Sequence, residues 1–295
     1  MGIIVNGTEI LAVKYNGVYL EKVYYDGTLY WEYRYYRNLT VENEQVGYDL
    51  YNELVKAGWD EELKVVTTLE VNGTLRASNR YNYALEVQSL PDGSSVTLIN
   101  NGKIKGAGGQ AGDASGGNGT PGGDAILARS YLDVENNGQI WAGGGGGGAG
   151  GKALFYNDGS VFGKSGGGGG GGAAGNPATG GGSASGTYMS SGQDDHNIDY
   201  ADDGQAGSVS SGGAGGDGTT ITGPTPAYTE TQGGDGGNGG DPGQGGQDGQ
   251  RGSTTSTSYS GVDSVSSDAG GQGGSGGDPV NGSGFVTYTT YGDVR

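Results

Sequence analysis

The amino-acid sequence predicts a mixed fold, in which a small N-terminal β-meander and an α+β unit precede a sandwich of β-strands and polyglycine type II helices. Three observations support this fold class. Asn-Gly and Asp-Gly pairs recur near the N-terminus, a strand-turn-strand motif repeats from residue 98, and 61 of the 71 glycines lie between residues 106 and 284. We predict the three parts at residues 1–37, 38–105 and 106–295.

Residues 1–37 are predicted to form the β-meander. Asn6-Gly7, Asn16-Gly17 and Asp26-Gly27 recur at a spacing of ten, flanked by Val, Ile, Leu or Tyr. Such pairs supply the two positive-φ residues of a type I′ turn, which is the strongest short-range signal for a hairpin. Because short hairpins alone are marginally stable, we expect this segment to lean on the next unit or on another protein.

Residues 38–105 are predicted to form the α+β unit. Apolar residues at helical spacing predict a helix over 44–57, with Asn43 as its N-cap and Gly58 as its stop signal. We expect strands over residues 65–71, 85–90 and 96–99.

A repeated motif leads into the glycine-rich part. Leu98–Gly106, Val134–Gly143 and Phe155–Gly163 each read as a strand, an Asn-Gly or Asp-Gly turn, an apolar strand and the start of a glycine tract. Repetition of this kind predicts equal structural units that stack on one another.

The glycine-rich tracts have a phase. Seven glycines from Gly234 to Gly252 keep a strict period of three, which is the repeat of the polyproline II helix. That helix has no internal hydrogen bonds, so its buried amides and carbonyls need partners on neighbouring chains. We therefore predict laterally bonded polyglycine II helices in six tracts, at residues 106–123, 142–151, 166–186, 204–218, 233–252 and 270–284.

The glycine tracts allow three other interpretations. A flexible linker is the default for a composition rich in Gly and Ser. A collagen triple helix needs unbroken Gly-X-Y, and the longest such stretch here is about six triplets with one proline, Pro242. A calcium β-roll motif is matched once, at Gly273–Asn281, without a tandem copy.

The composition leaves little material for catalysis. Without cysteine the chain has no disulfides, thiolate zinc sites or cysteine nucleophiles, and His196 is its one histidine. Gly159–Ser165 has one residue too few between its glycines for a P-loop, and Asp194-Asp195-His196 reads as a solvated acidic loop. We therefore expect no enzymatic activity, no cofactor and no metal site.

The charge argues against nucleic acid as a partner. The net charge is −18, and residues 106–295 hold 5 basic against 19 acidic side chains. Because neutralisation of phosphates drives nucleic-acid affinity, a chain without a basic stripe is a poor candidate for that function.

The sequence resembles the tip adhesins of T-even bacteriophage long tail fibres over about residues 96–284. Leu98–Gly109 and Asn136–Gly151 carry the resemblance most clearly, since Asn-Asn-Gly-x-Ile precedes a long glycine run in both. The resemblance implies a polyglycine sandwich in the virion tail, whose distal loops bind an outer-membrane protein or a surface saccharide of the host. The N-terminal part does not match that family's attachment domain, so the attachment mode and homo-oligomerisation are left open.

The predicted binding residues lie on the loops at 187–203, 219–232 and 253–269. These loops combine Tyr with Ser, Gly, Asn and Thr, the composition of adaptable binding surfaces; packing of any one Tyr on the sandwich is an equal alternative. The predicted contact residues are Tyr188, Met189, His196, Tyr200, Ile221, Tyr228, Tyr259 and Val262. Segments 124–141 and 152–165 are more apolar and are predicted to belong to the core.

The leading hypothesis is a non-enzymatic phage receptor-binding protein, joined to another virion tail protein by its N-terminal region. The alternative is a structural or decoration protein of the virion whose loops bind nothing specific. A weaker third hypothesis is an ice-binding protein, which predicts regular Thr or Ala ranks where the tracts show Asp, Gln and Ser.

Overall fold

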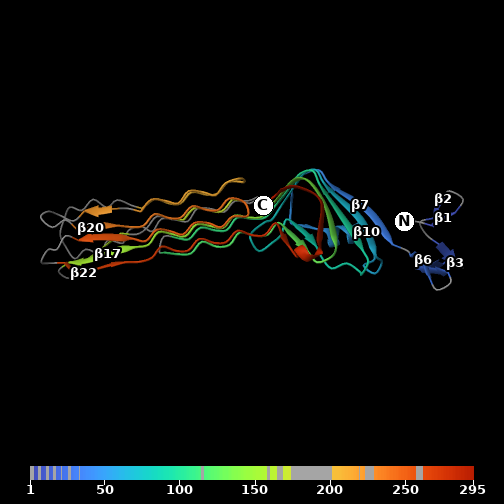
Figure 1. Cartoon of the computed structure of the whole chain (residues 1–295), viewed down its shortest axis with the longest axis horizontal. Coiled ribbons are helices and arrows are strands. Elements are labelled where there is room, and N and C mark those ends of the chain that lie inside the picture. Colours follow the sequence, from blue (N-terminus) through green and yellow to red (C-terminus); the bar gives the residue numbers. More distant parts are fainter. Residues whose placement is uncertain are drawn as a thin grey trace.

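The computed structural model shows an elongated molecule (Figure 1), with short hairpins at one end, a stack of strands in the middle and long glycine tracts that reach the other end. It describes six short strands within the first 32 residues. Beyond these it describes residues 34–113, 116–157, 160–164, 169–173, 201–218, 220–222, 229–256 and 262–295.

The N-terminal strands form three antiparallel hairpins. The pairs are β1 (Ile3–Val5) with β2 (Thr8–Ile10), β3 (Val13–Tyr15) with β4 (Val18–Leu20), and β5 (Lys22–Tyr25) with β6 (Thr28–Glu32). Each pair is closed by two residues, as the turn motifs predict, although those turn residues lie outside the described part. In the described residues these pairs form three separate two-stranded sheets and not the predicted continuous meander.

The middle of the molecule is a solenoid of parallel strands, in which successive coils of the chain stack in register. The first face holds β7 (Tyr35–Val41), β10 (Val65–Val71), β13 (Ser95–Asn100), β16 (Leu132–Trp141) and β24 (Val286–Val294). The second face holds β8 (Gln45–Val46), β11 (Thr74–Arg76), β14 (Lys103–Lys105) and the end of β16. The third face holds β9 (Tyr48–Asp49), β12 (Leu85–Val87), β15 (Ile126–Ala128) and β23 (Val280–Asn281).

Alternating side chains of these strands build the core. Along β10 every second residue is buried, as expected where one face of a strand packs inward. Leu69, Leu98 and Val134 lie opposite one another on neighbouring coils and are fully buried. The first coil is covered by helix α1 (Leu50–Lys56), whose Leu50 and Leu54 are also fully buried.

Helix α1 is shorter than the sequence predicts. Its N-cap is Asp49, whose Oδ1 accepts a hydrogen bond of 3.3 Å from the Asn52 amide, and Asn43 has no such role. Residues 45–49, predicted as the first part of the helix, instead form β8 and β9, because they pair with the next coil at Leu75 and Leu85. Pairing between distant segments overrides the local helical spacing here.

The Asn-Gly motifs form the corners between the first two faces. Asn100 and Asn136 are buried opposite one another, and Asn100 Nδ2 donates to Asn136 Oδ1 at 2.7 Å. A Cβ on Gly102 would lie 2.0 Å from the Gly73 carbonyl oxygen of the coil below, so this corner needs glycine. The stacked units predicted by the repeat are therefore present in its first two copies.

One corner of the solenoid grows from coil to coil. Between the second and third faces, the first coil has only Gly47, the second has residues 77–84, the third 106–125 and the fourth 142–279. The glycine tracts are thus insertions at a single corner, and the parallel ladder continues into them. The Gly106 amide donates to the Trp141 carbonyl at 2.8 Å.

The solenoid extends beyond residue 105, since β16 and β24 complete its first sheet. The three-part division of the chain stays a prediction. The described residues contain no helix with the length and hydrophobicity of a membrane span.

We predict that Asn100→Ala lowers the free energy of unfolding by about 1–3 kcal/mol, because it leaves buried polar partners unsatisfied. The Asn100 side chain bonds Asn136 Oδ1, the Gln139 carbonyl and the Gly102 amide. Asn137→Ala is the matched control. The Asn137 side chain donates to Asn101 Oδ1 in an exposed ladder next to the buried pair, and we expect its loss to lower the free energy of unfolding by about 0.5 kcal/mol or less. Urea denaturation measures both, and equal losses would contradict a role for the buried ladder.

Candidate functional site

A bundle of hydrogen-bonded glycine tracts connects the solenoid to the far end of the molecule (Figure 1). Its central tract is residues 142–151, all of which are buried. Six neighbouring tracts, each bonded to the next, form a closed ring around it, at residues 106–113, 117–124, 268–277, 244–252, 233–241 and 169–173.

The central tract exchanges backbone hydrogen bonds with the whole ring. Gly144 donates to the Ala173 carbonyl at 2.7 Å and accepts from the Gly109 amide at 2.8 Å. Gly145 donates to the Gln244 carbonyl at 2.9 Å and accepts from the Gly240 amide at 2.7 Å. Buried peptide groups are thereby satisfied between tracts and not within them.

Close approach of the backbones excludes a side chain at consecutive glycines of the central tract. A Cβ on Gly145 would lie 2.0 Å from the Gly274 carbonyl oxygen, and one on Gly146 would lie 1.9 Å from that of Gln110. A Cβ on Gly147 would lie 2.0 Å from the Gly237 carbonyl oxygen. Since these three consecutive residues face three different tracts, glycine is required at each of them.

At the margin of the bundle, side-chain oxygens accept hydrogen bonds from backbone amides of an outer tract. The Oδ1 atoms of Asp235, Asn238 and Asp241 accept from the amides of glycines on the tract 211–218, at 2.9, 2.9 and 3.2 Å. The same bond joins Asp248 Oδ1 to the Gly273 amide at 2.8 Å. Acidic and amide residues at a spacing of three therefore hold outer tracts in place.

The far end of the bundle carries two small antiparallel sheets (Figure 1). In one, β17 (Ala153–Asn157) pairs with β18 (Ser160–Lys164) and with β22 (Val262–Ser267). In the other, β20 (Thr229–Gln232) pairs with β19 (Thr220–Thr222) and with β21 (Ser253–Ser256). Segments that are far apart in the sequence are thus brought together at this end.

Two of the predicted contact residues fall on these sheets. Ile221 lies in β19 opposite Thr231, and Val262 begins β22 opposite Asn157. The other six, which are Tyr188, Met189, His196, Tyr200, Tyr228 and Tyr259, lie outside the described residues, so their predicted role stays a prediction.

The segment 152–165 was wrongly predicted to belong to the core. It forms the hairpin β17–β18 at the far end, where β17 pairs with β22. Its apolar composition suggested a core strand, but the glycine tract before it carries the chain away from the solenoid. The Asp158-Gly159 pair was the available signal, since it marks a hairpin turn. Segment 124–141 does supply core strands, β15 and β16.

The opposite end of the bundle rests on the solenoid. The turn Ser208–Ser211 lies there, with the Val209 carbonyl 3.5 Å from Lys105 Nζ. Lys105 Nζ also lies 4.3 Å from the centre of the Trp141 ring. Burial lowers the pKa of Lys105, and the nearby charge of Lys103 lowers it further. The turn therefore lies at the solenoid end of the bundle, and the two small sheets lie at the other end, away from the solenoid (Figure 1).

The described residues contain no cluster of three or more His, Cys, Asp or Glu side chains that could hold a metal ion. The described part of the far end consists of the two antiparallel sheets, which stand on the hydrogen-bonded glycine bundle.

Comparison with known proteins gives one family and one solved structure. The model of the phage tail fibre adhesin Gp38 family matches residues 36–217. The crystal structure of the gp37–gp38 adhesin tip complex of the bacteriophage S16 long tail fibre is similar at 21% identity, with a TM-score of 0.47. That match covers 89% of this chain and 81% of the other. No curated protein matches the sequence.

We predict that Gly146→Ala strongly destabilises the bundle, because its Cβ would meet a backbone oxygen that cannot move aside. Gly245→Ala is the matched control on the neighbouring tract, where the nearest atom to a Cβ lies at 3.2 Å. Calorimetry should show a clear fall in the melting temperature for the first variant and a small change for the second. Equal melting temperatures would contradict the proposed close packing.

We also predict that Asn238→Ala loosens the outer tract, since the Gly215 amide loses its acceptor. Hydrogen exchange should accelerate at Gly215, while the amide of Gly145 in the central tract keeps its rate. Unchanged exchange at Gly215 would show that the side-chain bond does not hold this tract.

Proposed function

This chain belongs to the phage tail fibre adhesin Gp38 family, and from that premise we propose that it recognises a receptor on the host cell surface through the hairpins and loops at the far end of its glycine bundle. Membership places the protein in the virion tail fibre, as an adhesin. The receptor class that we propose is an outer-membrane protein or a surface saccharide of the host.

The convergence of separate segments at the far end carries the proposal. Strand β22 pairs with β17, and β21 pairs with β20. These pairings bring strands from the segments 152–165, 219–232 and 253–269 together at one end of the molecule, far from the N-terminal hairpins (Figure 1). A binding surface built from several loops on a rigid support is a recurrent solution for recognition.

We infer that the tracts are polyglycine II helices. Bonds between the same two tracts recur at every third residue, as in Gly106 to Trp141, Gly109 to Gly144 and Gly112 to Gly147, which matches the period of that helix. At about 3.1 Å per residue, a ten-residue tract spans about 31 Å. The bundle thus acts as a rigid spacer, which holds the binding end clear of the solenoid.

The proposed activity is binding without catalysis, with no cofactor. We further propose that the hairpins β1–β2, β3–β4 and β5–β6, which lie within the predicted attachment segment 1–37, join the adhesin to another protein of the tail. Their separation from the solenoid sheets supports this role, since they form no ladder with any described strand of the solenoid.

We predict that exchange of the three segments 152–165, 219–232 and 253–269 for those of a related adhesin redirects adsorption to the other host. The measurement is binding of the purified full chain to cells of both hosts. The matched control replaces Val209 and Ser210 in the turn Ser208–Ser211, which lies at the opposite end of the same bundle, and should leave binding unchanged. Unaltered host preference after the exchange would favour a structural role without receptor binding.

A further inference from the structure

The two ends of the solenoid differ in the regularity of their edge strands. Strand β24 pairs with β16 through two register shifts, and its Gly292 has a φ of 33°. Irregularities of this kind twist an edge away from new strands. Strand β7, at the other end, pairs with β10 from Tyr35 to Val41 without any shift. The β7 edge therefore keeps the geometry that a further strand requires.

Alternate residues of β7 direct their backbone groups away from the solenoid. The Tyr35 amide donates to the Lys64 carbonyl at 2.8 Å, and the Val41 carbonyl accepts from the Asn72 amide at 2.9 Å. Because neighbouring residues of a strand bond to opposite sides, Asn38 and Thr40 present their N–H and C=O groups outward. Both residues are exposed, and their backbone groups have no hydrogen bond on that side within the described part of the chain.

Helix α1 covers the end of the core but not this edge. Its buried Leu50 and Leu54 pack into the core, and the helix lies against β12 on the third face. A hydrogen bond of 2.8 Å from the Tyr35 hydroxyl to the Ala57 carbonyl joins β7 to the end of the helix. The apolar interior is thus closed at this end, while no described strand pairs with the outer edge of β7 beside it.

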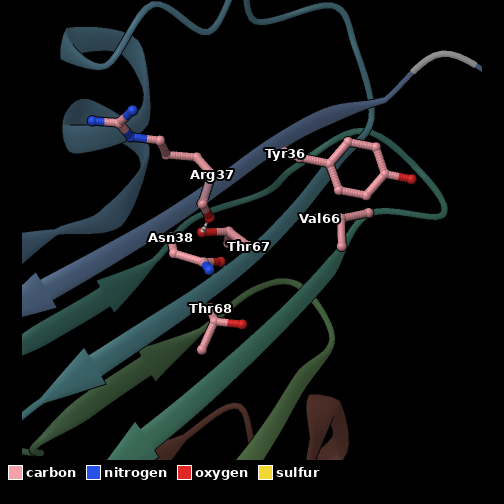
Figure 2. A pocket seen from close by; sticks show the side chains of 6 residues that line it. All are labelled: Tyr36, Arg37, Asn38, Val66, Thr67 and Thr68. Carbon is pink, nitrogen blue, oxygen red and sulfur yellow. Dashed lines mark hydrogen bonds between the residues drawn. The ribbon is translucent and has the colours of Figure 1, made fainter. Parts of the chain in front are cut away.

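A shallow hollow lies beside the same edge. Its volume is about 240 Å³, and it is lined by Tyr36, Arg37, Asn38, Val66, Thr67 and Thr68. Figure 2 shows β7 and β10 side by side there, with the Thr67 hydroxyl donating to the Arg37 carbonyl at 2.6 Å. In strand addition, main-chain bonds supply affinity and such hollows accept alternate side chains of the incoming strand.

The positive charge of Arg37 at this edge favours an incoming strand that carries an acidic residue. Arg37 is exposed and forms no ion pair among the described residues, in a chain whose net charge is −18. Its side chain extends from β7 toward α1 (Figure 2). An acidic residue on a partner strand would meet it there, whereas a second copy would bring the same arginine.

From these features we propose that the outer edge of β7 binds an extended strand, carrying an acidic residue, from another protein of the tail fibre. The hairpins that we propose as the attachment segment lie at this same end of the molecule (Figure 1), so a partner held by them lies beside β7. The inference rests on the proposed attachment of the N-terminal region. It adds a second contact in which backbone hydrogen bonds extend the solenoid sheet into the partner.

The test is Asn38→Pro in the full chain, with the fibre protein of the same phage as the probe. Proline removes the outward N–H but no bond to β10, and it is tolerated on edge strands. Asn38→Ala, which keeps the N–H, is the matched control. We expect affinity for the fibre protein to fall about tenfold or more for proline and to change little for alanine. Circular dichroism checks that both variants fold.

Amide hydrogen exchange of the wild-type chain gives a second, independent test. In the complex with the fibre protein, the amides of Asn38 and Thr40 should exchange about tenfold more slowly than in the free chain. Unchanged exchange at both, or full affinity of Asn38→Pro, would overturn the proposal. So would a wild-type dimer, seen by sedimentation, that Asn38→Pro dissociates, since the occupant would then be a second copy.

Host-cell binding separates this proposal from the proposed function. The isolated Asn38→Pro variant should bind host cells as the wild type does, because β7 lies in the solenoid and the strands β17, β20 and β22 lie at the far end of the glycine bundle (Figure 1). Loss of fibre binding with intact cell binding supports the β7 contact. Absence of cell binding by the wild type would contradict the receptor role and leave the fibre measurement valid.

Discussion

Lateral hydrogen bonding between backbones is the constraint on which the glycine-rich part of the structure depends. A tract without internal hydrogen bonds is stable when buried only if its neighbours supply a donor or acceptor at every residue. Residues 143–149 and 151 of the central tract meet this condition through a closed ring of six other tracts. At Gly143–Gly148, Gly150 and Gly151 the separation that permits those bonds leaves no room for a Cβ, so at these positions glycine and lateral hydrogen bonding are parts of one requirement.

The solenoid sets the register of this bundle. Its stacked coils already bring parallel strands into line, and the ladder from Lys105 and Trp141 passes into the tracts that follow. The chain enters and leaves the bundle at the corner between the second and third faces. At that corner the second coil has only residues 77–84, and the first coil has only Gly47. Folding of the solenoid therefore fixes where the first tracts start, and each later tract adds to a surface whose hydrogen-bonding positions are already defined.

Local sequence patterns predicted local structure correctly. The predictions were wrong where pairing or placement by distant segments determines the structure. The turn pairs predicted the hairpins of the first 32 residues, and the period of three predicted tracts bonded side by side. The helical spacing predicts a helix over 44–57 that is longer than α1, because residues 45–49 pair with the next coil as β8 and β9. The position of hairpin β17–β18 depends on the tract before it, which no apolar pattern within 152–165 can reveal.

The division between bundle and far end assigns different constraints to neighbouring residues. At the glycines of 142–151 almost every substitution would place a Cβ against a backbone oxygen. On the tract 233–241, by contrast, Asp235 and Asn238 each accept a hydrogen bond from an amide of the tract 211–218, so either residue type can supply the acceptor at such a position. At the far end, the ladders β17–β22 and β20–β21 hold the hairpins by their own backbones. Changes in the residues that connect these strands therefore leave the support intact. A protein built in this way can alter the surface that it presents while its core sequence stays fixed.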